Sequence, residues 1–211
     1  ILLGFICAVT IQGALIEAAA GRQLSDADRF PVTAMTQAAP WEAAAGRRIR
    51  DKQFDFCHAQ LLDPIYGFFP AEVGQQLASS CLTRAISVLH FAPALPSAHL
   101  AVATARYRLG SERTALEALA LARQASPYGG KTAQRRLILA LHMHGAGVSD
   151  ALVGAELDVA IMLESFLLRE NLALMFHRAP AAQPWLLATI ERAPLAQQQR
   201  FVETIQRLSL D

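Results

Sequence analysis

The amino-acid sequence predicts an all-α protein in which an N-terminal transmembrane helix precedes an array of stacked helical hairpins, an α-solenoid. Pro93 and Pro127 lie 34 residues apart and each ends a similar alanine-rich stretch, a repeat length typical of stacked helical hairpins. The first twenty residues are apolar apart from Gln12 and Glu17, and a helix of that length spans one hydrocarbon core. Proline and glycine separate the remaining helical patterns, and no segment carries a convincing strand pattern.

The overall composition supports a folded chain with some membrane character. Of its 211 residues, 53% are apolar and 18% are charged, which is too apolar for a disordered chain and low in charge for a purely soluble one. Nineteen basic residues nearly balance eighteen acidic ones, for a net charge of +1. Because nucleic-acid binding favours a clear basic excess, we expect no nucleic acid among the partners.

The N-terminal segment organises the chain into three parts. Residues 1–20 are expected to form a membrane anchor, residues 21–40 a linker, and residues 41–211 the helical domain. A signal peptide is one alternative, since small residues precede Gly21, and a buried helix of a soluble protein is another. Arg22 and Arg29 follow the apolar run, but they do not fix the orientation of an anchor.

The cysteines bear on the compartment. Cys7 lies within the predicted anchor, which leaves Cys57 and Cys81 as a pair in the rest of the chain. A disulfide between them would suit an oxidising compartment. Two free thiols in a helical core are the alternative, because cysteine packs well as a small apolar residue.

The helical elements follow from apolar periodicity and from proline and glycine breaks. The turn-rich segment Asp63–Pro70 interrupts the pattern, and its aromatic residues Tyr66, Phe68 and Phe69 are expected to pack on the core. The expected helices cover residues 41–62, 71–91, 96–109, 112–125, 130–144, 149–168, 169–178, 181–192 and 194–208.

The first of these helices carries a basic cluster, made of Arg47, Arg48, Arg50 and Lys52. The cluster predicts either a membrane-surface or partner-binding patch or an ordinary solvated face. Asp51 and Asp55 balance part of its charge.

The segment 96–127 resembles one repeat of the tetratricopeptide (TPR) family. The residues that carry the resemblance are Ala103, Gly110, Ala115, Leu119, Ala122 and Pro127. Glycine at position 110 allows a left-handed helix end, the alanines allow close helix approach, and the leucine fills the space between hairpins. His99 and Arg106 depart from the family pattern. Because a TPR array usually needs about three repeats, the flanking helices are expected to act as divergent caps.

A longer stretch, residues 105–141, resembles small bacterial membrane-anchored TPR-like proteins encoded near O-antigen ligase-like or exopolysaccharide-polymerising proteins. This resemblance implies a single-pass protein of the bacterial inner membrane with a periplasmic helical domain. The apolar segment at residues 1–20, the TPR-like unit and the apolar composition together predict a multi-spanning membrane protein as partner, contacted by the anchor and by the helical domain.

One motif favours a different class of protein. Ala125–Thr132 fits a relaxed phosphate-binding loop that ends in Gly130, Lys131 and Thr132. Such a loop follows a strand, whereas the preceding residues have a helical, alanine-rich pattern. An inter-helical turn is therefore favoured over a nucleotide-binding enzyme.

Other chemical motifs are weak. His142 and His144 are two residues apart and would point in different directions on a helix, whereas two ligands on one helix face need a spacing of three or four. The sequence contains no nucleophile elbow, HExxH or CxxC motif. We therefore expect no catalytic residues, no metal and no cofactor.

A local basic excess marks a candidate partner surface. Over residues 106–136, seven basic side chains face only Glu112 and Glu117, an excess of +5. A shared face would suit acidic lipid headgroups, an acidic partner or an anionic polysaccharide, whereas scattered solvated side chains are the alternative. The seven are Arg106, Arg108, Arg113, Arg123, Lys131, Arg135 and Arg136.

The function that these observations favour is non-catalytic. We expect a membrane-anchored accessory subunit that assembles or stabilises a larger membrane complex. A polysaccharide-binding module and a nucleotide-binding enzyme are the alternatives.

Overall fold

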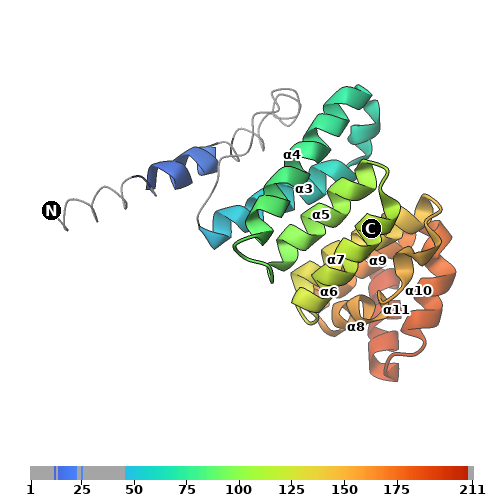
Figure 1. Cartoon of the computed structure of the whole chain (residues 1–211). Helices are drawn as coiled ribbons and strands as arrows, with labels where there is room; N and C mark the ends of the chain where they lie inside the picture. The colour runs from blue at the N-terminus through green and yellow to red at the C-terminus, as the bar shows by residue number, and fades with distance from the viewer. Residues whose placement is uncertain (1–11, 13, 23–24, 26–45, 209–211) are drawn as a thin grey trace. The chain divides into compact units, whose positions relative to one another are not determined.

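A computed structural model describes residues 12, 14–22, 25 and 46–208. Within these residues the chain consists of helices and their connecting turns, with no strand, which confirms the all-α fold class (Figure 1). The chain separates into two compact units, Ile1–Ser111 and Glu112–Asp211, called here the N-terminal and C-terminal units.

The predicted anchor and linker lie largely outside the described residues. Of the anchor, residues 12 and 14–20 are described and are helical. Of the linker, only residues 21, 22 and 25 are described. No helix in the described part of the chain combines the length and apolar character needed to cross a membrane.

Within residues 46–111, the N-terminal unit contains the helices α3, α4 and α5 and one short 3₁₀ turn (Figure 1). α5 packs against both of the other helices. Its core includes Cys57, Leu61, Leu77, Cys81 and Ala105, with Tyr66 and Phe69 packed against it from the turn. Phe68, by contrast, is 88% exposed, so one of the three aromatic residues expected to hold the turn does not do so. The elements are α3 (Arg47–Leu62), η1 (Pro64–Phe68), α4 (Ala71–Leu89) and α5 (Pro96–Arg108).

Proline and glycine define the ends of these helices. Pro70 is the N-cap residue of α4, and Pro96 occupies the first turn of α5, where its missing N–H leaves no hydrogen bond unmade. Gly110 follows α5 with a φ of +77°. The amides of Gly110 and Ser111 donate to the carbonyls of Tyr107 and Arg106 at 3.0 and 2.9 Å. This left-handed end closes the helix in the way that glycine favours.

The C-terminal unit contains a core of helices linked by short turns (Figure 1). α8 packs against α7 and α9, and α11 packs against α9. Its most buried large side chains include Leu137, Met143, Met162, Leu172 and Phe201. The elements are α6 (Glu112–Ala125), α7 (Gly130–Gly145), η2 (Ser149–Leu152), α8 (Glu156–Glu164), α9 (Phe166–Arg178), η3 (Pro180–Ala182), α10 (Gln183–Ile190) and α11 (Leu195–Leu208).

The prediction of one helix over residues 149–168 is wrong. The chain forms η2, turns at Gly154 with a φ of +74°, and only then begins α8. Positive φ is strained for residues other than glycine and interrupts a right-handed helix. The next break lies at Ser165, whose backbone is extended (φ −96°, ψ 136°), rather than after residue 168.

The predicted TPR-like repeat, residues 96–127, corresponds to α5 and α6, and the boundary between the two units falls between them. Among its defining residues, the three alanines and Leu119 are fully buried, each within its own unit. Pro127 is half-buried and follows the last residue of α6 by two positions.

Candidate partner-binding surfaces

The seven basic residues predicted as a partner surface are divided between the two units. Arg106 and Arg108 belong to the N-terminal unit, and the other five belong to the C-terminal unit. Three of the seven bind other parts of their own unit, so the expected single basic face requires correction.

Arg108 holds the end of α5 against the start of the turn. Its Nε donates to the carbonyl oxygen of Leu61, and its guanidinium lies 4.7 Å from the ring centroid of Tyr66 and 5.6 Å from that of Tyr107. Burial lowers the pKa of Arg108, and the two tyrosines oppose that shift. The cation–π contacts and the helix-end hydrogen bond assign this arginine to internal packing.

Arg136 is fully buried and ion-paired with Asp158. Its Nε and Nη2 lie 2.9 and 2.6 Å from the same carboxylate oxygen, Oδ1. Its Nη1 donates to the carbonyls of Ala122 and Ser126, at 3.1 and 2.7 Å. A buried charge needs such partners because burial removes its hydration. Arg136 therefore cannot contribute to an exposed surface.

Arg123 completes the same arrangement, which we call the Asp158 cluster (Arg123, Arg136 and Asp158). Its Nε lies 3.3 Å from Asp158 Oδ2, and its Nη1 donates to the carbonyl of Val153 at 2.6 Å. Burial lowers the pKa of Arg123, and the nearby carboxylate of Asp158 opposes that shift. The cluster ties α6 and α7 to α8 and to the turn before α8.

All of the seven predicted residues except Arg136 retain some exposed surface. Arg113 and Lys131 are exposed, whereas Arg106 and Arg135 are half-buried. Arg113 forms a surface ion pair with Glu117, four residues along α6, at 3.8 Å. Surface pairs of this kind contribute little to stability.

Sequence reasoning missed Asp158, although a signal was present. The residue interrupts the apolar stretch Leu157–Leu163, and a carboxylate within an apolar helical stretch usually has a buried basic partner. The identity of that partner was hidden, because Arg136 is 22 residues away in the sequence.

The suspected phosphate loop, Ala125–Thr132, is a turn between two helices. α6 precedes it and α7 begins at Gly130, so the strand that a phosphate loop requires is replaced by a helix. A Cβ on Gly129 would lie 2.4 Å from the hydroxyl of Ser126, and one on Gly130 would lie 2.7 Å from Leu168. A Cβ at either position would therefore require the neighbouring side chain to shift.

The described residues contain no group of three or more histidine, cysteine or acidic side chains placed to hold a metal ion. His142 and His144 both lie on α7 and are half-buried.

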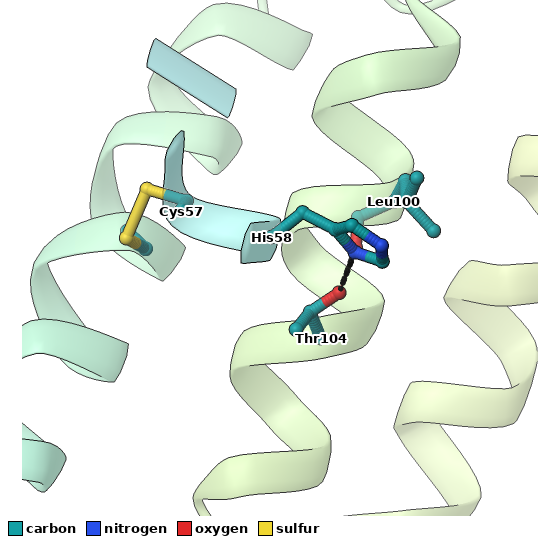
Figure 2. Close-up of a disulfide and its surroundings, with 5 residues drawn as sticks. Cys57, His58, Leu100 and Thr104 are labelled. Carbon is teal, nitrogen blue, oxygen red and sulfur yellow. Dashed lines mark hydrogen bonds between the residues drawn. A yellow bond between two sulfur atoms is a disulfide. The ribbon is translucent and has the colours of Figure 1, made fainter. Parts of the chain in front are cut away.

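A disulfide joins Cys57 of α3 to Cys81 of α4 (Figure 2). The sulfur atoms are 2.10 Å apart, the Cα atoms are 5.9 Å apart, and both residues are buried. Beside it, the side chain of His58 reaches α5, where its Nδ1 lies 3.0 Å from the hydroxyl oxygen of Thr104. That hydroxyl donates to the carbonyl of Leu100 at 2.9 Å, so the Nδ1 of His58 is assigned as the donor to Thr104.

The C-terminal unit exposes two rows of apolar side chains, which we call the α9 row (Leu167 and Leu174) and the α11 row (Leu195 and Val202). Residues seven apart lie on the same helix face. α9 and α11 are packed together, with Phe176 against Phe201 in an edge-to-face contact of 6.1 Å.

A groove of about 270 Å³ lies in the same unit, between α8, α10 and the start of α11. Most of its lining is apolar, and Glu156, Arg192 and Gln197 add polar groups. The apolar lining residues are Val159, Ala160, Leu163, Ala193 and Pro194.

No family model, curated protein or solved structure matches this chain. The fold and surfaces define its class as an all-α protein whose C-terminal unit exposes apolar helix faces.

Proposed function

We propose that this chain is a non-catalytic, membrane-anchored scaffold or accessory subunit that assembles or stabilises a larger membrane protein complex. In this proposal its helices form a TPR-like array in the periplasm of a bacterium, and the complex takes part in envelope polysaccharide synthesis. The observation that supports it most is the pair of exposed apolar rows on α9 and α11.

Exposed apolar rows favour a protein partner. Covering them would remove from water apolar surface that the folded chain alone leaves exposed, which contributes free energy to binding. Each buried Å² of apolar surface contributes roughly 25 cal/mol, and apolar surface patches often mark interaction sites. A spacing of seven residues on a helix also suits contact with a second helix, as in paired helices.

The membrane part of the proposal comes from the sequence. The apolar run at residues 1–20 supplies a contact within the bilayer, and the rows of the C-terminal unit supply a contact outside it. A multi-spanning membrane protein is the partner that would use both. The buried disulfide supports the periplasmic side, because disulfides persist in oxidising compartments.

Two alternatives differ in their support. A polysaccharide-binding module would use the exposed basic residues Arg113 and Lys131. A nucleotide-binding enzyme would depend on Ala125–Thr132, and the helix before that turn argues against it.

Photo-crosslinking in cells tests the proposal. Crosslinkers placed in the anchor (residues 1–20) and at Leu174 should trap the same multi-spanning membrane protein. Leu167→Asp combined with Leu174→Asp should abolish the crosslink from Leu195 without changing the circular dichroism spectrum. Val153→Asp is the matched control, because Val153 is an exposed apolar residue of the same unit that lies outside both rows.

Two results would contradict the proposal. In one, the crosslinkers in the anchor and in the rows trap no protein, or those in the anchor and those in the rows trap different, unrelated proteins. The other is tight binding of an anionic polysaccharide that is lost in Arg113→Gln with Lys131→Gln, which would support the polysaccharide-binding alternative.

A further inference from the structure

The end of the N-terminal unit where α3 begins and α4 finishes gathers basic side chains and one exposed aromatic residue. We call this surface the basic end. Arg48 and Lys52 are exposed on α3, four residues apart and hence on the same helix face. Its members are Arg48, Arg50 and Lys52 of α3, Arg84 of α4, and Phe91 just after α4.

The disulfide sets the register of this helix pair, and it places Arg50 about one helical turn farther from the turn at residues 63–70 than Arg84. α3 and α4 are joined by the turn at residues 63–70 and by the disulfide, so they run in opposite directions. Cys57 and Cys81 face each other with their Cα atoms 5.9 Å apart. Arg50 lies seven residues beyond Cys57 and Arg84 three residues beyond Cys81, which is roughly 10 and 5 Å along the two helix axes. Arg50 also shares the helix face of Cys57, seven residues away, and Arg84 follows Cys81 by one turn.

Both arginines are half-buried. The Nε of Arg50 is buried and has no hydrogen-bond partner among the described residues. Burial, together with the positive charge of Arg50, lowers the pKa of Arg84. The positive charges of both arginines lie at this end of the unit and attract anions to its surface.

The first turn of α3 is basic in sequence, and the carboxylate at its N-cap residue comes from Glu17, outside the helix. The first turn of α3 contains no acidic residue, although acidic side chains are favoured there because a helix N-terminus is already partly positive. The neighbouring Asp51 accepts a hydrogen bond from Ser97 of α5 at 2.6 Å.

The apolar N-terminal segment is connected to this end. Glu17, within that segment, accepts a hydrogen bond from the backbone amide of Gly46 at 2.5 Å. Gly46 is the N-cap residue of α3. The contact therefore links the apolar run to the start of the basic end, within one unit of the protein.

Phe91 is the last component, and it is 84% exposed. Its backbone amide donates to Val88 at 3.0 Å, so it is fixed at the finish of α4. Aromatic side chains beside basic ones are typical of surfaces that lie at the headgroup level of a membrane.

We propose that the basic end docks on the anionic phospholipid headgroups of the membrane that holds the anchor, with its arginines and lysine contacting headgroup phosphates and Phe91 entering the interface. This rests on the membrane attachment proposed above. Docking fixes the orientation of the N-terminal unit at the membrane, which a flexible tether would leave undefined.

Fluorescence quenching in vesicles tests the docking. The full chain carries Phe91→Trp as reporter, with Trp41→Phe and Trp185→Phe to remove other signals. It is reconstituted with brominated lipids in phosphatidylcholine alone or mixed with phosphatidylglycerol in equal amounts. We expect strong quenching only with phosphatidylglycerol, and a docking constant that falls roughly fivefold for each of Arg50→Gln and Arg84→Gln.

Matched variants separate docking from folding. Arg50→Lys with Arg84→Lys keeps the charge and should retain most of the docking. Arg48→Gln with Lys52→Gln changes only exposed side chains and should weaken docking roughly 25-fold, fivefold for each charge, even if the variants of Arg50 and Arg84 fail to fold. Arg113→Gln with Arg200→Gln removes two exposed charges of the C-terminal unit and should leave the quenching unchanged.

Three results would overturn the docking proposal. Equal quenching in phosphatidylcholine alone would show that docking does not depend on anionic lipid. Absence of quenching would show that the basic end does not dock. A docking constant left unchanged by Arg50→Gln and by Arg84→Gln would show that these arginines take no part in docking. Retention after an alkaline carbonate wash reports the anchor separately, so failure of the anchor and failure of docking are distinguishable.

Discussion

The two units belong to the same fold class but are fastened by different chemistry. In the N-terminal unit a covalent bond, Cys57–Cys81, lies inside an apolar core. In the C-terminal unit an ionic group, the Asp158 cluster, is buried among the helices. One unit therefore relies on a bond that reduction can break, and the other relies on a charge balance that one substitution can break.

The disulfide and the ion pairs stabilise the fold through different states of the chain. A disulfide stabilises mainly by restricting the unfolded chain, so its contribution depends on the length of the loop that it closes. A buried ion pair acts in the folded state, where its attraction offsets the loss of hydration of both groups. Removing one partner then leaves a buried charge without compensation.

The largest expected effect comes from Asp158→Ala. It would leave Arg136 buried with only carbonyl partners and Arg123 with a single one. We expect a loss of about 3–5 kcal/mol in the free energy of unfolding. Chemical denaturation measures this loss, and hydrogen exchange should place the larger loss of protection within residues 112–208.

Glu117→Ala provides the matched control, because it also removes the acidic partner of an arginine in the C-terminal unit. That pair is largely exposed, so its removal should leave the denaturation midpoint unchanged. If both substitutions gave the same denaturation midpoint, the Asp158 cluster would not be a main contributor to the stability of this unit.

The next effect concerns the disulfide. Cys57→Ala with Cys81→Ala removes a cross-link between residues 24 positions apart, and loop-closure entropy predicts a loss of roughly 2–4 kcal/mol. Wild-type protein treated with a reductant should unfold at a lower denaturant concentration, whereas the double variant should not respond to the reductant. Identical midpoints of oxidised and reduced wild-type protein would contradict this prediction.

The smallest effect tests close packing in α6. Ala122→Leu adds volume at a fully buried position, and overpacking typically lowers stability by about 1–3 kcal/mol. Ala120→Leu is the control on the same helix, because Ala120 is exposed. Equal melting temperatures for the two variants would show that position 122 has room for a larger side chain.

The sequence predicted the helices best where proline, glycine and periodicity agree. The helix at residues 112–125 is confirmed as α6, and the turn at Gly110 has the left-handed conformation expected there. The division at Gly154 and Ser165 was missed, because an apolar stretch with helical periodicity continues through both positions. The membrane anchor and the TPR-like arrangement stay predictions.

The candidate surfaces were harder to predict because they depend on contacts between distant residues. The local sequence does not distinguish exposed from buried members among the seven basic residues. In the structure, Arg108, Arg123 and Arg136 bind partners 22–47 residues away. The α9 and α11 rows show the same limitation. Their leucines and valine follow the same pattern as core residues, and only packing separates the two groups.

The disulfide has a further consequence for how the chain survives cleavage. The loop between Cys57 and Cys81 contains the turn at Pro64–Phe68, where Phe68 projects into solvent. A protease that cuts this turn would leave two pieces joined through sulfur, with the apolar core still between them. The cut molecule would run as one band on a non-reducing gel and as two after reduction. The disulfide therefore keeps the two fragments together after the chain is cleaved at the exposed turn.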